Sequence, residues 1–317
     1  MTEYADRPGE RPTATPAPVA PPPPGGLLWD VVGDVRTVLS LPAALTLQVA
    51  HPAVGAGVDD HSVFRTDPWG RGERSLRSLC CWVYGGADAV AEGRRLRRIH
   101  RNIRGTDAHG RPYHALDPAV YAWVHATGFP IALRTRAYLA RRPFTPTEQR
   151  RLYAEWRQVG RVLGIAEQNL PPTVEEFWPT YHRMVQHELE RTKVADELLT
   201  PGGPVPPPDR GPRALQAVLR LLWPVLAPPL GRLRCFLTAG LLPPDAREVL
   251  GVPWSARQER RLRHFGRVVA VVVPLLPERL RYLPPARRAR ARHRHTATSA
   301  VPRPRARSNV AGGVPCR

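Results

Sequence analysis

Apolar residues recur every three or four positions over most of the chain between Leu27 and Leu283, which is the period of one face of a helix. In the first such stretch, Leu27 to Ala50, Pro42 is expected to end one helix before a second, short helix closes near His51. Further helices are predicted over residues 75–84, 87–104, 118–142, 146–163, 173–189, 213–236 and 255–276. No alternating apolar and polar run of useful length predicts a strand, so the pattern indicates an all-α fold.

Several of these predicted helices begin with a recognisable capping residue. Asp117 precedes a proline, so it combines an N-cap oxygen with a proline in the first helical position. Thr145 and Glu148 have the spacing of a capping box, and Thr173 starts a similar pattern. Pro130, inside the predicted helix 118–142, is expected to kink it.

Turn-forming residues separate the helices. Residues 55–72 contain several glycines and aspartates and are predicted to form a loop that covers another part of the fold. Residues 107–112 are predicted to form a turn, and residues 200–212 form a proline- and glycine-rich linker.

Composition predicts three regions. Residues 1–26 form a proline-rich leader with too few apolar side chains to offset chain entropy, so disorder is expected there. Residues 27–283 form one helical globular domain, and residues 284–317 are expected to be a disordered arginine-rich tail. The leader lacks the basic start and apolar run of a secretory signal.

The chain is strongly basic, with a formal net charge of +20. Lys193 is the only lysine among 47 basic side chains, a bias typical of arginine codons in a GC-rich genome. The arginines are spread over nearly every predicted element, whereas a DNA-reading protein concentrates them on one recognition face. We therefore expect no specific nucleic-acid partner, although the tail offers a weak contact for phosphates or a membrane surface.

The four cysteines have no metal-binding spacing, and Cys80 and Cys81 are adjacent. A reduced, cytoplasmic protein is the simplest interpretation. The longest uninterrupted apolar run, residues 268–276, is far shorter than the ~20 residues of a membrane span. No transmembrane segment is predicted.

Common catalytic motifs are absent from the sequence, including the glycine-rich nucleotide loops, the nucleophile elbow and the zincin motif. His187 and Glu188 resemble the start of a zincin motif, but Arg191 stands where the second histidine ligand belongs. The sequence therefore directs attention to its other histidines.

Four histidines, His51, His61, His100 and His125, precede or lie within the predicted helices of the first half of the chain. His100 follows Leu96 by four residues and so lies on or beside an apolar stripe. His125 is followed one turn later by Gly128, and this small residue leaves room for a flat cofactor or substrate. By position alone, each histidine is more often a hydrogen-bonded core residue than a ligand.

Three segments carry a family resemblance: LPAALTLQVAHPAVGAGVDDHSVFRTDPWGR at 41–71, RRLRRIHRNIRGTDAHGRPYHALDPAVYAWVHATG at 94–128, and LPPTVEEFWPTYHRMV at 170–185. They resemble the MpaB-type oxygenase family, which is related to the latex-clearing rubber oxygenases. The resemblance spans roughly residues 27–283. It implies an all-helical fold that binds haem b.

The resemblance also implies roles for particular residues. His125, in the segment WVHATG, would be the proximal iron ligand, with Thr127 and Gly128 beside the cofactor. In the rubber-cleaving relatives a preceding helix supplies an arginine, a lysine and a threonine on the distal side. This chain reads RRLRRIHRN there, without lysine or threonine. The candidates for the distal side of the haem are therefore His100, Arg97 and Arg101, which would act in catalysis. His51 is a further candidate there and would bind the cofactor.

The sequence thus predicts a haem-dependent oxygenase that acts with dioxygen on an apolar, isoprenoid- or lipid-like substrate. Two alternatives stay open. One is a helical protein of the same fold that binds a non-haem metal or a lipid, and the other is a basic binding protein that acts through its arginine-rich tail. The sequence names neither the substrate nor an electron donor.

Overall fold

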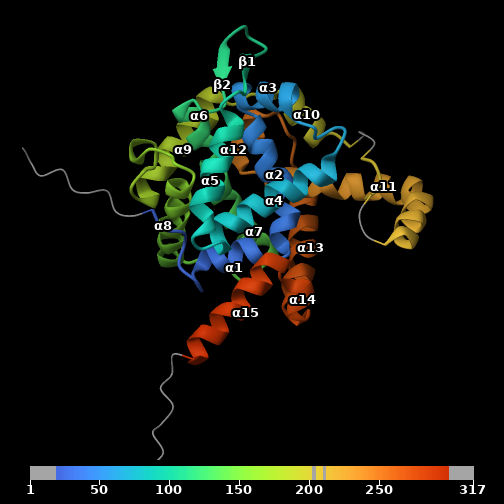
Figure 1. Cartoon of the computed structure of the whole chain (residues 1–317). Helices are drawn as coiled ribbons and strands as arrows, with labels where there is room; N and C mark the ends of the chain where they lie inside the picture. Colours follow the sequence, from blue (N-terminus) through green and yellow to red (C-terminus); the bar gives the residue numbers. More distant parts are fainter. Residues whose placement is uncertain (1–18, 202–204, 210–211, 300–317) are drawn as a thin grey trace, which may run out of the picture.

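The computed structural model describes residues 19–201, 205–209 and 212–299, and these residues are almost entirely helical (Figure 1). The elements are α1 (Leu27–Gly33), α2 (Arg36–Val49), α3 (Pro52–His61), α4 (Pro68–Tyr84), α5 (Asp88–His100), β1 (Arg104–Thr106), β2 (Pro112–His114), α6 (Pro118–Ala126), α7 (Gly128–Leu139), α8 (Pro146–Val162), the 3-10 turn η1 (Glu167–Asn169), α9 (Val174–Glu188), α10 (Lys193–Leu199), α11 (Arg213–Leu241), α12 (Pro244–Val249), α13 (Ala256–Leu275), α14 (Glu278–Arg281) and α15 (Pro284–Ser299). The all-α prediction is confirmed. β1 and β2 form a short antiparallel hairpin where the sequence predicts a turn.

Helix α2 lies at the centre of the fold. It packs against α3, α7, α10 and α11, while α4 and α5 pair beside it. Its Leu47 is fully buried and belongs to one large core, which also contains the aromatic cluster of Phe129, Phe177 and Tyr181. The aromatic rings of this cluster therefore join α7 to α9.

The predicted capping residues are confirmed. The Asp117 carboxylate accepts hydrogen bonds at the start of α6, and Thr145 and Glu148 form a complete capping box at α8. Thr173 accepts from a backbone N–H in the first turn of α9. These side chains satisfy backbone donors that a helix start otherwise leaves unpaired.

Helix α1 is capped from a distance. Its N-cap residue, Gly26, has no side chain to accept a hydrogen bond, and the buried carboxylate of Glu155 on α8 takes that role. Its two oxygens accept from Leu27 N at 3.1 Å and Leu28 N at 2.7 Å. A negative charge at a helix N-terminus is also favoured by the helix dipole.

Two predicted boundaries in the first hundred residues are wrong. α2 continues through Pro42, and the break falls earlier, at Asp34, whose carboxylate binds the Arg36 guanidinium at 2.6 Å. Residues 55–72, predicted as a loop, lie largely in α3 and α4. Gly55 is required in α3 because a Cβ there would lie 2.7 Å from the carbonyl oxygen of Val49, so packing against α2 overrides its poor helix propensity.

The predicted helix 118–142 is two helices, α6 and α7, which meet at Thr127. Pro130 therefore lies in the first turn of α7, where the missing N–H has no intrahelical partner to lose. The kink expected at Pro130 is replaced by the break at Thr127.

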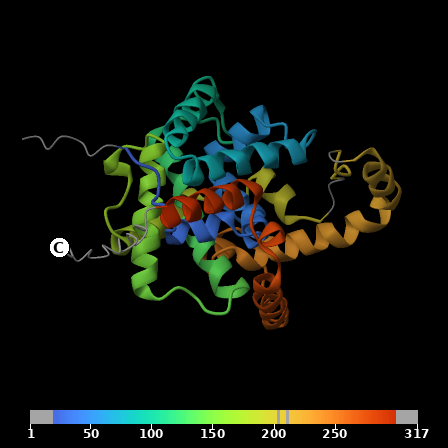
Figure 2. The same cartoon turned by 60° about the horizontal axis from the view of Figure 1, so that its bottom comes forward.

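The prediction of a disordered tail beginning at residue 284 is wrong for its first sixteen residues, which form α15. Ala286 and Ala289 are buried, and α15 packs on α1 and α4 (Figure 2). Arg290 forms an ion pair with Asp30 at 2.5 Å and lies over the Tyr282 ring. The expectations for residues 1–18 and 300–317 lie outside the described residues.

Helix α11 begins where the sequence predicts but continues to Leu241, beyond the predicted end at residue 236. It contains Pro224, Pro228 and Pro229, bends, and projects from the helical body (Figures 1 and 2). Although the sequence pattern predicts no membrane span, α11 is long and apolar enough to cross a membrane by length and composition alone. Its apolar window is entirely unburied.

Candidate functional site

A cavity of about 510 Å³ lies inside the helical body. Helices α2 to α8 contribute most of its wall, with residues such as Leu41, Leu45, Leu79 and Ile131 making it largely apolar. Its volume is within the range of ligand and cofactor sites, which combine an apolar wall with a few polar groups. The polar groups in this wall therefore define the chemistry that the cavity can perform.

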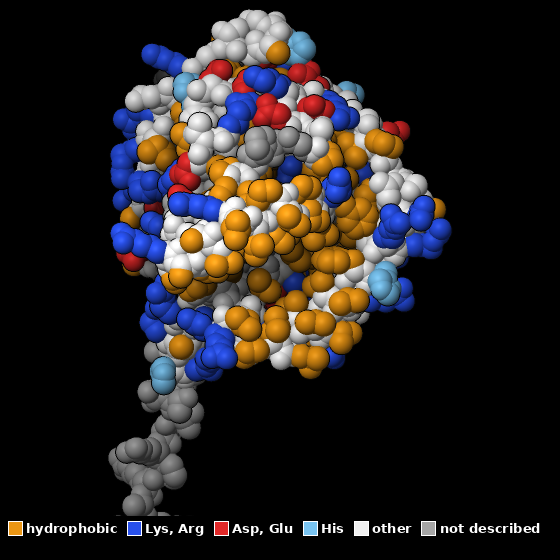
Figure 3. Space-filling model, turned by 90° about the vertical axis from the view of Figure 1, so that its right-hand side faces the viewer, with side chains coloured by type: hydrophobic (Ala, Val, Ile, Leu, Met, Phe, Trp, Pro, Cys, Tyr) orange, Lys and Arg blue, Asp and Glu red, His pale blue; other side chains and the backbone are white. Residues whose placement is uncertain are grey.

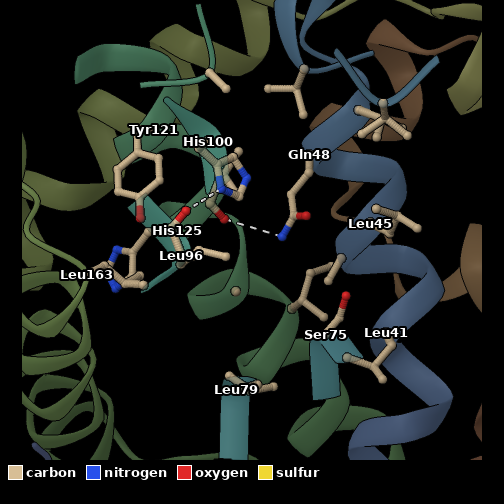
Figure 4. A pocket seen from close by; sticks show the side chains of 18 of the residues that line it. Leu41, Leu45, Gln48, Ser75, Leu79, Leu96, His100, Tyr121, His125 and Leu163 are labelled. Carbon is tan, nitrogen blue, oxygen red and sulfur yellow. Dashed lines mark hydrogen bonds between the residues drawn. The ribbon is translucent and has the colours of Figure 1, made fainter. Parts of the chain in front are cut away.

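His100, at the last residue of α5, is half-buried and lines this cavity (Figure 4). Its Nδ1 lies 2.8 Å from the carbonyl oxygen of Leu96, which can only accept, so Nδ1 carries the proton. Nε2 then holds the lone pair, and it makes no hydrogen bond within the described part of the chain. Burial is the main cause that lowers the pKa of His100, and the Arg71 charge adds to it, so the ring is neutral near neutral pH. A neutral imidazole fixed in this tautomer is prepared to bind a metal through Nε2.

His125 also lines the cavity, but its ring is engaged with α8. Its Nε2 donates to the carbonyl oxygen of Trp156 at 3.0 Å, and Trp156 Nε1 donates back to the carbonyl oxygen of His125 at 3.1 Å. The two rings stack with centroids 5.1 Å apart. Burial lowers the pKa of His125 to about 4. This reciprocal pair is a neutral link that holds α6 against α8.

Gly128 lines the cavity and also packs closely against Trp156 on α8. A Cβ at Gly128 would lie 2.3 Å from Cζ2 of Trp156, so the glycine admits the indole ring that stacks on His125. Because the glycine also lines the cavity, the expectation that it leaves room for a flat cofactor stays a prediction. Gly128 is needed for helix packing.

Thr127 is fully buried at the break between α6 and α7 and does not itself line the cavity. Its hydroxyl donates to the carbonyl oxygen of Val124 at 2.8 Å and accepts from Gln48 Nε2 at 3.2 Å. Gln48 lines the cavity from α2 and also donates to Val124 at 3.3 Å (Figure 4). The amide therefore connects the central helix to the break opposite it.

Arg71 on α4 is a cavity-lining residue that the sequence pattern did not reveal. The guanidinium donates to the hydroxyls of Ser62 at 3.0 Å and Ser75 at 3.3 Å, and it makes no ion pair within the described part of the chain. Desolvation, followed by the nearby Arg74 charge, lowers its pKa. A half-buried cation without a carboxylate partner is costly unless a ligand supplies the negative charge. Ser75 lines the cavity as well, so α4 provides both a guanidinium and a hydroxyl.

The two arginines predicted as catalytic lie outside the wall. Arg97 lies over the Tyr121 ring at 5.6 Å and donates to the carbonyl oxygen of Gly164 at 3.2 Å. Arg101 follows α5, is exposed, and does not line the cavity. Arg97 therefore contacts the cavity wall through Tyr121, whose ring lies 6.3 Å from that of His100.

Tyr121 was not singled out from the sequence, although it shares a face of α6 with His125. Its buried hydroxyl has no hydrogen-bond partner among the described residues, and desolvation raises its pKa to about 12. An unpaired buried hydroxyl in the wall of a cavity is available to a ligand.

His51 and His61 are the remaining histidines of the predicted group, and of these two only His61 shares the cavity wall with His100. His51 is the N-cap residue of α3, does not line the cavity, and has a buried Nδ1 without a partner among the described residues. Desolvation is the main cause that lowers its pKa. His61 lies at the end of α3 on the cavity wall, with Nε2 at 3.4 Å from the carbonyl oxygen of Arg104.

The described residues contain no group of three or more His, Cys, Asp or Glu side chains that could hold a metal ion together. Cys80, Cys81 and Cys235 are free thiols, and burial raises the pKa of Cys80 to about 11. A metal in this cavity would therefore depend on a cofactor for most of its ligands, with a single imidazole from the protein.

A helical body around an apolar cavity with a neutral histidine and an unpaired guanidinium is suited to a buried cofactor or an apolar ligand. The chain belongs to the family described as ER-bound oxygenase mpaB/B'/Rubber oxygenase, catalytic domain, whose family model matches residues 29–271. This chain therefore carries an oxygenase catalytic domain.

Two relatives from mycobacteria are similar over most of their length. Uncharacterized protein Mb2261 of Mycobacterium bovis and Uncharacterized protein Rv2237 of Mycobacterium tuberculosis are each 25% identical over 245 residues. The match covers 75% of this chain and 90% of each relative. No solved structure matches the chain significantly.

Proposed function

We propose that this protein is a haem-dependent oxygenase that acts with dioxygen on an apolar, isoprenoid- or lipid-like substrate. The observation that carries the proposal is the His100 imidazole in the wall of the cavity. Its Nδ1 proton is bound to Leu96 and its Nε2 is left without a partner among the described residues. One such imidazole is enough to hold the iron of a b-type haem, which would supply the chemistry that binds and activates dioxygen.

The choice of His100 as the iron ligand revises what the family resemblance implies. His125 uses its Nε2 proton to hold Trp156, and the stacked indole covers one face of its ring. If His125 bound the iron through Nε2, it would lose that hydrogen bond, which joins α6 to α8. His100 can ligate without losing any hydrogen bond of the described structure. We therefore propose that His100 holds the iron and that His125 supports the wall.

The remaining polar groups of the wall have complementary roles in this proposal. Arg71 would neutralise a carboxylate of the bound group or donate to an oxygen atom, because a guanidinium binds such groups strongly. The Ser75 hydroxyl and the Gln48 amide add neutral donors from α4 and α2. In this proposal α4 supplies the arginine and the hydroxyl that a different helix supplies in the rubber-cleaving relatives.

The apolar part of the wall indicates the substrate class. Apolar side chains, many of them leucine, valine and isoleucine, line most of the cavity, so an uncharged hydrocarbon chain would be stabilised there by the loss of its water-exposed surface. Tyr121 offers its unpaired hydroxyl to a single polar group on such a chain.

The experiment is haemin reconstitution of the purified full chain, read by absorption spectroscopy. Wild type is expected to give a Soret band, which His100→Ala loses and added imidazole restores. Folded His125→Ala is expected to keep the band, because its ring supports packing. Circular dichroism establishes that each variant is folded before its spectrum is compared.

Two results would overturn the proposal in different parts. Absence of a Soret band in folded, haemin-treated wild type refutes haem dependence, and metal analysis then distinguishes a non-haem protein. A band that persists in His100→Ala but disappears in folded His125→Ala refutes the choice of ligand and restores the assignment implied by the family resemblance.

A further inference from the structure

Helices α11 and α13 present a broad apolar surface to solvent (Figure 3). No side chain between Arg213 and Arg234 of α11 is buried, and the helix joins the core only from Cys235 onward. Leu221 is 79% exposed and Val225 is 74% exposed. The other large apolar side chains exposed on the two helices are Leu215, Val218, Leu222, Leu226, Leu230, Leu233, Val268, Val271, Val272 and Leu275.

Folding of the isolated chain does not explain this surface. Each large apolar side chain left in water forgoes the favourable free energy of its burial, and α11 and α13 leave many of them exposed together. Scattered exposed leucines are ordinary, but a contiguous apolar face marks a site of contact with a protein or a membrane.

The charges of the two helices distinguish between these partners. α11 and α13 carry nine arginines and a single glutamate, Glu259, which is already paired with Arg263 at 2.7 Å. A second copy of this chain would bring the same cations against the first. An anionic lipid surface instead supplies acyl chains for the leucines and phosphates for the arginines.

The arrangement along α13 fits such a surface. Its first half lines a surface hollow with three guanidinium groups, those of Arg257, Arg260 and Arg261, and its second half is the apolar run that begins at Val268. Phosphate-binding and acyl-binding groups are therefore adjacent on one helix, which is the pattern of helices that lie in a membrane interface.

An interfacial position also fits better than a membrane span. Only eleven residues separate Arg220 from Arg232 on α11, whereas about 20 apolar residues are needed to cross the hydrocarbon layer. A span formed by α11 alone would also leave the apolar half of α13 in water. We propose that α11 and α13 together form a membrane-docking face, which inserts its leucines and valines into the surface of an anionic bilayer.

The test is co-sedimentation of the full chain with vesicles of phosphatidylcholine alone or with added phosphatidylglycerol. Binding to the anionic vesicles is expected, and weaker binding to the neutral ones. The double variant Leu221→Gln/Val225→Gln and the double variant Arg260→Gln/Arg261→Gln should each reduce anionic-vesicle binding roughly tenfold or more.

Ile99→Gln is the matched control, because Ile99 is 52% exposed but lies on α5, away from this face. It should bind anionic vesicles like wild type, and thermal unfolding of all variants tests that each is folded. Wild-type protein that ignores anionic vesicles, or folded face variants that bind like Ile99→Gln, would overturn the proposal.

Two further outcomes would replace it. A dimer in the absence of lipid that Leu221→Gln/Val225→Gln dissociates, with no vesicle binding, would make the face a contact between copies of the chain. Protein that remains in the bilayer after alkaline carbonate extraction would make α11 a membrane span. These outcomes are independent of haem binding, so the docking face and the proposed oxygenase activity can fail separately.

Discussion

Replacing Gly128 by alanine tests the packing of α7 against α8. The new Cβ would lie 2.3 Å and 2.5 Å from Cζ2 and Cη2 of Trp156, whereas carbon atoms pack at about 3.5–4.0 Å. The indole ring must therefore move by roughly 1 Å, and it takes with it the two hydrogen bonds that join Trp156 and His125.

The expected magnitude combines opposing terms. Overpacking costs about 1–3 kcal/mol, and weakening of the two buried hydrogen bonds adds about 1 kcal/mol. Alanine recovers up to about 1 kcal/mol through its higher helix propensity. The net loss is about 2 kcal/mol, which corresponds to a fall of roughly 4–8 °C in the Tm of a domain of this size.

Thermal and urea unfolding, followed by circular dichroism, measure this loss. Gly72→Ala is the matched control, because Gly72 is an exposed glycine in α4 and a Cβ added to it would have no other atom within 4 Å. It should keep or slightly raise the Tm. If Gly128→Ala proves as stable as Gly72→Ala, the interlocked packing of Trp156 and His125 is refuted.

Three further predictions concern other parts of the fold. Burial lowers the pKa of His125 to about 4, so the unfolded chain binds a proton before the folded chain does as the pH falls. Urea unfolding should therefore show that the free energy of unfolding falls by roughly 2 kcal/mol between about pH 7 and about pH 5. His125→Gln should abolish this pH dependence. Glu155→Ala should cost about 2–4 kcal/mol in the same assay, since it leaves one buried and one partly buried N–H group of α1 unpaired. An unchanged midpoint would contradict the capping role of Glu155. Arg290→Ala should cost about 1 kcal/mol, and a double-mutant cycle with Asp30→Asn should show coupling; additive effects would argue against the ion pair.

The sequence predicts helices well where the start signal is local. Asp117, Thr145 and Thr173 each bond to backbone groups two or three residues ahead, so the signal and its effect lie in one short segment. The α3 segment was missed because its glycines and aspartates are poor helix formers. Its helical conformation depends on packing against α2, which no local pattern reveals.

The same distinction applies to the site. Helical spacing identified His100 and His125 as histidines of the inner faces, and both line the cavity. Which nitrogen of each ring is free depends on Leu96 and on Trp156, and Trp156 is 31 residues away from His125. Arg71 escaped notice because the segment around it was predicted to be a loop, whereas α4 turns its side chain toward the cavity.

The central position of α2 has a mechanical consequence. One side of this helix lines the cavity through Leu41 and Leu45, and another packs against α11. An α-helix with its side chains is about 10 Å across, so a single helix separates the interior cavity from the base of α11. A displacement of α11 would therefore reach the cavity wall through α2 and through α7, which also contacts α11. Gln48, near the end of α2, would carry it to the break between α6 and α7.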